Sequence, residues 1–163
     1  MGNFDDIKEW ELNVSDIHRK YRLGDNSDAF EEIKGLKPIF AFDYISLNQT
    51  SFCFNSKLMG GRDFYKMLKS LKSISKYTYD TINSDDRFHF HEVKWTDVTI
   101  SKADFEKCIY EQEKVKVKGD ITPYQFKLFQ EARVFGFIYK GVFYLVMLDR
   151  NHNGYKRKDR KKK

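Results

Sequence analysis

Residues 133–149 read RVFGFIY-KG-VFYLVMLD, two runs of β-branched and aromatic residues separated by Lys140-Gly141. Two such runs joined by two residues, the second of them a glycine, are typical of a tight antiparallel hairpin. Both faces of both runs are apolar. We therefore expect the hairpin to lie in the centre of a sheet that is covered on each side. Gly136 predicts a place where another group packs closely on the sheet.

The short turn also predicts how the two runs pair. Starting from Tyr139 opposite Val142, simple counting gives the partners along the rest of the hairpin. The expected pairs are Phe135 with Val146, Gly136 with Leu145, and Arg133 with Leu148. Arg133 then lies at the open end of the hairpin, near Asp149 and the polar residues that follow it.

The segments upstream of the hairpin mix strand patterns and helix patterns. Alternating or apolar runs predict strands at 39–45, 51–54, 87–95 and 124–130, although the last segment also fits the start of a helix. Helices are predicted at 62–76, where apolar residues recur at helical spacing, and from 101 onward, where Ser101 and Asp104 resemble a capping box. This second helix should bury Phe105, Cys108 and Ile109. The fold class is therefore α+β, a single domain with a mostly antiparallel, curled sheet packed with helices.

Charge divides the chain into three parts. Residues 1–35 form an acidic segment with one or two short polar helices and a break at Gly24-Asp25-Asn26-Ser27, and residues 36–155 form the core domain. Residues 156–163 carry seven basic residues and one acid, which equals the whole net charge of +6. This tail contains no apolar residue, so we expect it to be disordered. The acidic segment either lies near a basic functional surface or is ordinary solvated surface.

Several classes of protein are not indicated by the sequence. No apolar run is long enough to span a membrane, and the N-terminus is acidic where a secretory signal is basic, which favours a cytoplasmic protein. Cys53 and Cys108 are far apart and predict buried thiols rather than a disulfide or a zinc site. Phosphate-binding loops, Rossmann fingerprints and serine hydrolase elbows are missing from the sequence, and we expect neither a metal nor a cofactor.

Groups suited to metal-free RNA cleavage gather at the open end of the hairpin. They are Glu131, Arg133, His152 and Tyr155. A guanidinium binds phosphate, an imidazole carries a proton near neutral pH, and a carboxylate or a phenol can assist. In the alternative interpretation, Arg133 and Asp149 form an ordinary ion pair and His152 lies in a polar loop.

Residues 131–155 resemble the C-terminal hairpin of the RelE/ParE superfamily of bacterial toxins. Members carry an arginine that opens a strand, a two-residue turn, an apolar strand, and then a histidine or arginine with a nearby tyrosine. The RelE branch cleaves mRNA in the ribosome without a metal. The resemblance implies that Arg133 contacts phosphate, His152 is the general acid, Tyr155 orients the base, and Glu131 matches the acid found in some members. It also implies RNA or the ribosome as a partner, and an antitoxin protein.

Three further groups of residues are candidates for nucleic-acid binding. The first is a basic stripe without an acid on the helix at 62–76, formed by Arg62, Lys66, Lys69 and Lys76. The second is one face of the expected strand at 87–95, formed by Arg87, His89, His91 and Trp95, which could stack on bases and contact phosphate. The third is the tail, including Lys156, Arg157 and Lys158. For the helix at 62–76, the alternative is an ordinary solvated face. For the strand at 87–95, the alternative is an edge strand whose tryptophan belongs to the core. A metal site formed by the two histidines is not indicated, because a third ligand is missing.

The leading hypothesis is an RNA-directed protein of the toxin type from a mobile or defence-associated locus, and its more specific form is an endoribonuclease. The opposing hypothesis is a non-enzymatic module that binds nucleic acid or an acidic partner. Induced expression should arrest growth and shorten mRNA if the first hypothesis is right. Binding without cleavage would support the second.

Overall fold

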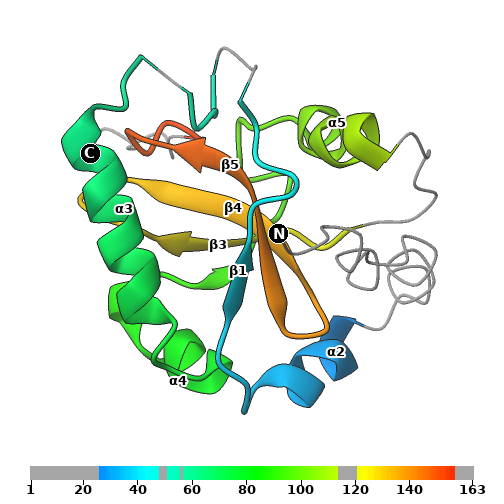
Figure 1. Ribbon diagram of the computed structural model, residues 1–163. Helices are drawn as coiled ribbons and strands as arrows, with labels where there is room; N and C mark the ends of the chain where they lie inside the picture. The colour runs from blue at the N-terminus through cyan, green and yellow to red at the C-terminus, as the bar shows by residue number, and fades with distance from the viewer. Residues whose placement is uncertain (1–25, 48–50, 56, 114–120, 157–163) are drawn as a thin grey trace, which may run out of the picture.

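A computed structural model describes residues 26–47, 51–55, 57–113 and 121–156. A five-stranded sheet lies between helices on its two faces (Figure 1). The strands are β1 (Ile39–Ala41), β2 (His91–Glu92), β3 (Tyr124–Lys127), β4 (Arg133–Tyr139) and β5 (Val142–Asp149). The helices are α2 (Asn26–Ile33), α3 (Gly61–Ile74), α4 (Tyr79–Ser84), the 3₁₀ helix η2 (Asp86–Phe88) and α5 (Lys102–Glu113).

The strands follow the order β1-β5-β4-β3-β2 across the sheet. Three neighbouring pairs are antiparallel, whereas the edge strand β1 runs parallel to β5. The sheet is therefore mixed rather than purely antiparallel. The predicted α+β class with a mostly antiparallel sheet is confirmed.

The central hairpin forms as expected, with a tight turn at Lys140-Gly141. Both turn residues adopt left-handed backbone angles, with φ of 48° and 82°, as a two-residue hairpin turn requires. Every residue of β4 is buried, and so is every residue of β5 after Val142. The predicted central position is confirmed.

A β-bulge changes the pairing beyond Gly136. From Tyr139–Val142 to Gly136–Leu145 the observed pairs agree with simple counting. The next pair is Phe135–Met147, so Val146 is an extra residue, and Arg133 lies opposite Asp149 rather than Leu148. The predicted pairs of Phe135 and Arg133 are therefore wrong. The carbonyl of Val146 accepts a hydrogen bond of 2.7 Å from the Ser46 amide.

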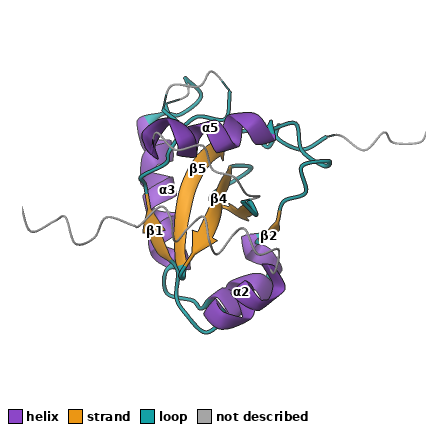
Figure 2. Cartoon of the chain, turned by 90° about the vertical axis from the view of Figure 1, so that its right-hand side faces the viewer, coloured by secondary structure: helices purple, strands orange, loops and turns teal. Residues whose placement is uncertain are grey.

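Each face of the sheet has its own apolar core. On one face α3 and α4 pack through Met67, Leu71, Ile74 and Ile82 against residues that include Val134 and Leu145. On the other face α5 packs through Phe105, Cys108 and Ile109 against residues that include Phe135 and Phe137. Figure 2 shows α5 and α2 at opposite ends of the molecule, with the sheet between them. We refer to these as the α3 face and the α5 face.

Gly136 lies where no side chain fits. A Cβ atom at this position would be 2.0 Å from the Tyr144 carbonyl oxygen and 2.5 Å from the Phe143 ring. The group that packs closely on Gly136 therefore belongs to the neighbouring strand β5. The predicted helices are also present as α3 and α5, and Phe105, Cys108 and Ile109 are buried as expected. Cys53 and Cys108 are both buried thiols, as expected.

Four expected elements differ in their extent or are absent from the structure. The strand predicted at 39–45 ends at Ala41, and residues 51–54 form no strand, although the Phe52 carbonyl accepts a hydrogen bond from Leu148. Segment 124–130 is a strand as favoured, but only over 124–127. Helix α2 begins at Asn26, inside the expected break, and the rest of the acidic segment lies outside the described residues. None of the helices in the described part of the chain has the length and apolarity needed to cross a bilayer.

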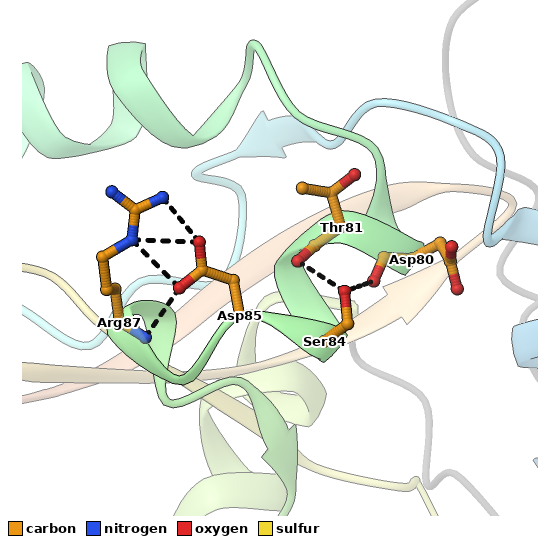
Figure 3. A network of polar contacts seen from close by, with 5 residues as sticks. All are labelled: Asp80, Thr81, Ser84, Asp85 and Arg87. Carbon is orange, nitrogen blue, oxygen red and sulfur yellow. Dashed lines mark hydrogen bonds and ion pairs between the residues drawn. The ribbon is translucent and has the colours of Figure 1, made fainter.

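The strand predicted at 87–95 is mostly absent. Its beginning is the 3₁₀ helix η2, in which Arg87 binds Asp85 through both its backbone amide and its guanidinium (Figure 3). His89 follows in a left-handed conformation with φ of 45°, which ends this helix before β2. The alternating pattern predicted a single extended strand because it could not show that Asp85 caps a turn at this point.

Candidate active site

Polar side chains gather on the α5 face, at the end of the sheet where β4 begins. Residues directly opposite each other in antiparallel strands point to the same face. Lys127, Arg133 and Asp149 are opposite one another across β3, β4 and β5, and they form one row. Because the bulge at Val146 shifts β5 by one residue, Asp149 joins this row instead of pointing to the α3 face.

The neighbouring row contains a histidine and a glutamine. His91 of β2 is opposite Gln125 of β3, which is opposite Phe135 of β4. The Gln125 amide nitrogen lies 2.8 Å from His91 Nε2 and donates to the His89 carbonyl at 3.3 Å. Gln125 is 2% exposed, so this amide is a fixed part of the sheet.

The loop after β5 brings His152 and Tyr155 to the same place. Asp149 accepts hydrogen bonds from the Asn153 amide at 2.9 Å and the Gly154 amide at 2.6 Å, and these bonds fold the loop back. The Tyr155 ring centre then lies 5.5 Å from that of His152 and 6.2 Å from that of His91. His152 has φ of 56°, a left-handed conformation that the loop imposes.

Glu131 lies beside His152, with 4.0 Å between a carboxylate oxygen and Nδ1 of the imidazole. Both side chains reach solvent, since 71% of Glu131 and 37% of His152 are exposed. The structure therefore brings together the four residues proposed from the hairpin end, and adds His89, His91, Gln125 and Lys127 to them. The sequence treated the two histidines of 87–95 as a separate candidate.

Arg133 is buried but makes few bonds. It is 5% exposed, and the one hydrogen bond of its side chain within the described residues runs from Nη1 to the Ala132 carbonyl at 3.2 Å. An ordinary ion pair with Asp149 is not formed, because the Asp149 oxygens hold the amides of the loop. Burial lowers the pKa of the Arg133 guanidinium, and the charges of Glu131 and Asp149 oppose this effect.

Three buried polar atoms in this cluster have no hydrogen-bond partner among the described residues. They are Arg133 Nε, Tyr155 Oη and Gln125 Oε1. A buried polar group left unpaired costs about 1–3 kcal/mol, so native proteins rarely keep one without a reason. Burial also raises the pKa of the Tyr155 phenol to about 12, with Arg133 acting in the opposite direction. The phenol is therefore a hydrogen-bond donor at neutral pH.

Other predicted binding residues lie elsewhere. Trp95 packs edge-to-face on Phe105, 5.4 Å between ring centres, so it belongs to the core of the α5 face. Arg87 is held by Asp85, so neither Trp95 nor Arg87 shares a face with the two histidines. The expected base-stacking face is therefore wrong in this form, although His89 and His91 belong to the new cluster.

The basic stripe belongs to α3, on the opposite side of the sheet from the cluster (Figure 1). Arg62, Lys69 and Lys76 are exposed, and Lys76 lies beyond the end of the helix. The expectation of a stripe without an acid is wrong, because Asp63 lies 3.8 Å from Lys66 and also binds Arg150.

The basic tail is described only at its first residue. The Lys156 amide donates to the Asp97 carbonyl, and its Nζ donates to the Thr96 carbonyl at 2.7 Å. Arg157, Lys158 and the rest of the tail lie outside the described residues. In the part of the chain that is described, no three His, Cys, Asp or Glu side chains are arranged to hold a metal ion.

A sequence model of the family described as "Uncharacterised protein UU032" matches residues 40–163. No curated protein and no solved structure matches the chain. The family match covers the whole sheet except its first residue, and all the residues of the polar cluster.

Proposed function

The chain belongs to the family of uncharacterised proteins UU032, and we propose that it cleaves RNA by a metal-independent reaction at the polar cluster on the α5 face. In this reaction the ribose 2′-oxygen attacks the adjacent phosphorus. A cation stabilises the charge on the phosphate, and an acid protonates the leaving 5′-oxygen. Arg133 binds the phosphate and His152 is the acid.

The three unpaired buried atoms carry this proposal. A phosphodiester offers acceptor oxygens to Arg133 Nε and to the Tyr155 hydroxyl, and both of these donors lack a partner among the described residues. Gln125 Oε1 is an acceptor, and a hydroxyl or a base N–H of the nucleotide would supply its donor. A bound nucleotide would therefore remove the cost of all three unmade bonds, at about 1–3 kcal/mol each.

Two further observations support the proposed roles. Lys127 and Arg133 lie side by side across β3 and β4, which concentrates positive charge where the phosphate would bind. Glu131 lies 4.0 Å from Nδ1 of His152, a position from which its carboxylate can orient the imidazole toward a substrate. Together with the resemblance to RelE/ParE toxins, this extends the proposal to a growth-arresting protein that acts on mRNA.

The alternative is a module that binds nucleic acid without cleaving it. Lys127, Arg133 and the exposed basic residues of α3 would serve equally well for binding alone. The two functions differ in the role of His152, because an imidazole beside a carboxylate adds little to affinity but is required for proton transfer.

The test is cleavage of a single-stranded RNA by the full chain, with and without a chelator. We expect wild-type protein to cleave in both conditions. Arg133→Met, which keeps the buried chain length but removes the donors, should lose on the order of 100-fold or more in kcat/KM. His152→Ala should lose a similar amount while RNA binding is retained. Arg87→Met is the matched control, because Arg87 is exposed and held by Asp85.

Growth after induced expression gives a second readout of the same variants. Wild-type protein and Arg87→Met should arrest growth, whereas Arg133→Met and His152→Ala should not. Binding without cleavage by the wild type would favour the alternative function, and loss of cleavage on chelation would contradict a metal-independent reaction.

A further inference from the structure

His89 is fixed at the edge of the polar cluster by its backbone. It follows η2 in a left-handed conformation, and its carbonyl accepts a hydrogen bond of 3.3 Å from the buried Gln125 amide. The side chain is exposed. Neither ring nitrogen of His89 makes a hydrogen bond within the described residues, so both are available to a ligand.

His91, the nearest alternative, is not available in the same way. Its Nδ1 lies 2.8 Å from the Glu92 carbonyl, and its Nε2 lies 2.8 Å from the Gln125 amide nitrogen. These two bonds fit one neutral tautomer, in which Nδ1 donates to the carbonyl and Nε2 accepts from the amide. Taking a proton on Nε2 would break the bond to Gln125. His91 therefore holds Gln125 in position.

Glu131 is also a poor candidate for the base of the reaction. Its carboxylate lies 4.0 Å from Nδ1 of the proposed acid His152, and 71% of its side chain is exposed. The proposed reaction thus has an acid and a phosphate-binding cation, but the group that removes the 2′-proton is not assigned.

The charges around His89 favour an unprotonated imidazole. Partial loss of contact with water at the edge of the sheet is the largest effect that lowers the pKa of His89. Arg133, Lys127 and His152 lower this pKa further, whereas Asp86 of η2 raises it. These groups belong to β3, β4, η2 and the loop after β5, and within the described part of the chain they are the charged groups that act on His89. A histidine that is neutral at neutral pH can accept a proton.

We propose that His89 is the general base and His152 the general acid of the same RNA-cleaving site, an assignment that rests on the proposed function. One ring nitrogen of His89 takes the proton of the 2′-hydroxyl as the bond from the 2′-oxygen to phosphorus forms. The bond from phosphorus to the 5′-oxygen breaks, and His152 gives its proton to that oxygen. The products are a 2′,3′-cyclic phosphate and a 5′-hydroxyl. The two histidines exchange protonation states, so the charges balance.

The backbone of His89 offers a favourable variant for the test. Because φ is 45°, glycine adopts this conformation without strain, and His89→Gly should fold as the wild type does. We expect His89→Gly to lose on the order of 100-fold or more in kcat/KM on RNA. Added imidazole should restore part of the rate, since it can occupy the space that the side chain leaves.

A substrate with sulfur in place of the leaving 5′-oxygen separates the base from the acid. A thiolate leaves without a proton, so this substrate no longer needs the acid. His152→Ala should recover most of its lost rate on it, whereas His89→Gly should stay slow. In the pH profile of kcat/KM, His89→Gly should lose the acidic limb, which the wild type should show below the ordinary histidine pKa of about 6.5. His91→Asn is the matched histidine variant and should keep this limb.

The outcomes separate the two proposals. If wild-type protein cleaves RNA and His89→Gly cleaves at the same rate, or recovers on the sulfur substrate, the assignment of the base is overturned while the proposed function stands. If wild-type protein yields no 2′,3′-cyclic phosphate ends, the proposed function fails and this assignment fails with it. A slow His89→Gly variant that imidazole rescues on both substrates supports the assignment.

Discussion

Asp149 holds the loop that presents His152, and its replacement by alanine tests whether the site depends on this one carboxylate. Asp149 is 2% exposed, and its two oxygens accept the amides of Asn153 and Gly154 at 2.9 and 2.6 Å. Gly154 is itself packed so closely that a Cβ atom would lie 2.8 Å from the carboxylate. We therefore expect the loop to depend on this carboxylate for its shape.

The expected loss of stability follows from these two bonds. A hydrogen bond to a charged group contributes about 1.5–3 kcal/mol, and the alanine variant also leaves the buried Gly154 amide without its partner. Removing a buried carboxylate recovers part of this, because burying a charge has its own cost. We expect Asp149→Ala to lower the free energy of unfolding by about 2–4 kcal/mol. For a chain of this size the melting temperature should fall by roughly 4–16 °C.

Urea and thermal unfolding, followed by circular dichroism, measure this effect. Asp43→Ala serves as the control, because Asp43 is exposed, and it should change the stability by less than about 0.5 kcal/mol. The loss of stability for Asp149→Asn should lie between those of the other two variants. The Asn carbonyl oxygen can accept from one loop N–H, but the NH₂ group would face the other loop N–H, and both of these are donors. A loss below about 1 kcal/mol for Asp149→Ala would refute the view that this carboxylate closes the loop.

Three further predictions concern single positions. Gly136→Ala should lower the free energy of unfolding in urea by about 3–5 kcal/mol, because its Cβ would lie 2.0 Å from a backbone oxygen of β5; a smaller loss would mean that the hairpin can yield. His152→Gly should leave thermal stability unchanged or raise it by up to about 1 kcal/mol while cleavage falls, since φ is 56°; a less stable variant would contradict this. Tyr155 has a pKa of about 12 in the folded protein against about 10 in the unfolded chain, so the folded protein keeps a proton that the unfolded chain releases. Stability should therefore fall as the pH rises from 10 through 12, and Tyr155→Phe should make this fall shallower when urea midpoints at pH 9 and 11 are compared.

The elements that the sequence predicted well are those with strong local signals. The hairpin has two apolar runs around Lys140-Gly141, and only a left-handed turn joins them. Helix α3 has apolar residues at helical spacing, of which Met67, Leu71 and Ile74 are buried. In each of these elements neighbouring residues carry the information, so no knowledge of distant contacts is needed.

The errors arose where contacts between distant segments decide the structure. Residues 51–54 have the composition of a strand but contribute only single hydrogen bonds, such as that from Leu148 to the Phe52 carbonyl. Segment 87–95 is a different case, because a local contact decides it: the segment alternates as a strand does, yet Asp85 caps the 3₁₀ helix Asp86–Phe88 at its start. Its two histidines still reach the hairpin end, because β2 pairs with β3 and β3 with β4. The alternation of residues within one strand does not indicate which strands are its neighbours in the sheet.

The bulge at Val146 is the least predictable feature and the most important for the candidate site. Leu145, Val146, Met147 and Leu148 are all apolar and buried, so any pairing register satisfies the hydrophobic pattern equally well. Without the extra residue, Asp149 would point to the α3 face, away from Arg133. The loop after β5 would then begin on the wrong side of the sheet to bring His152 beside Glu131. A sequence can thus supply all the groups of a site while a one-residue insertion in an apolar strand determines whether they meet.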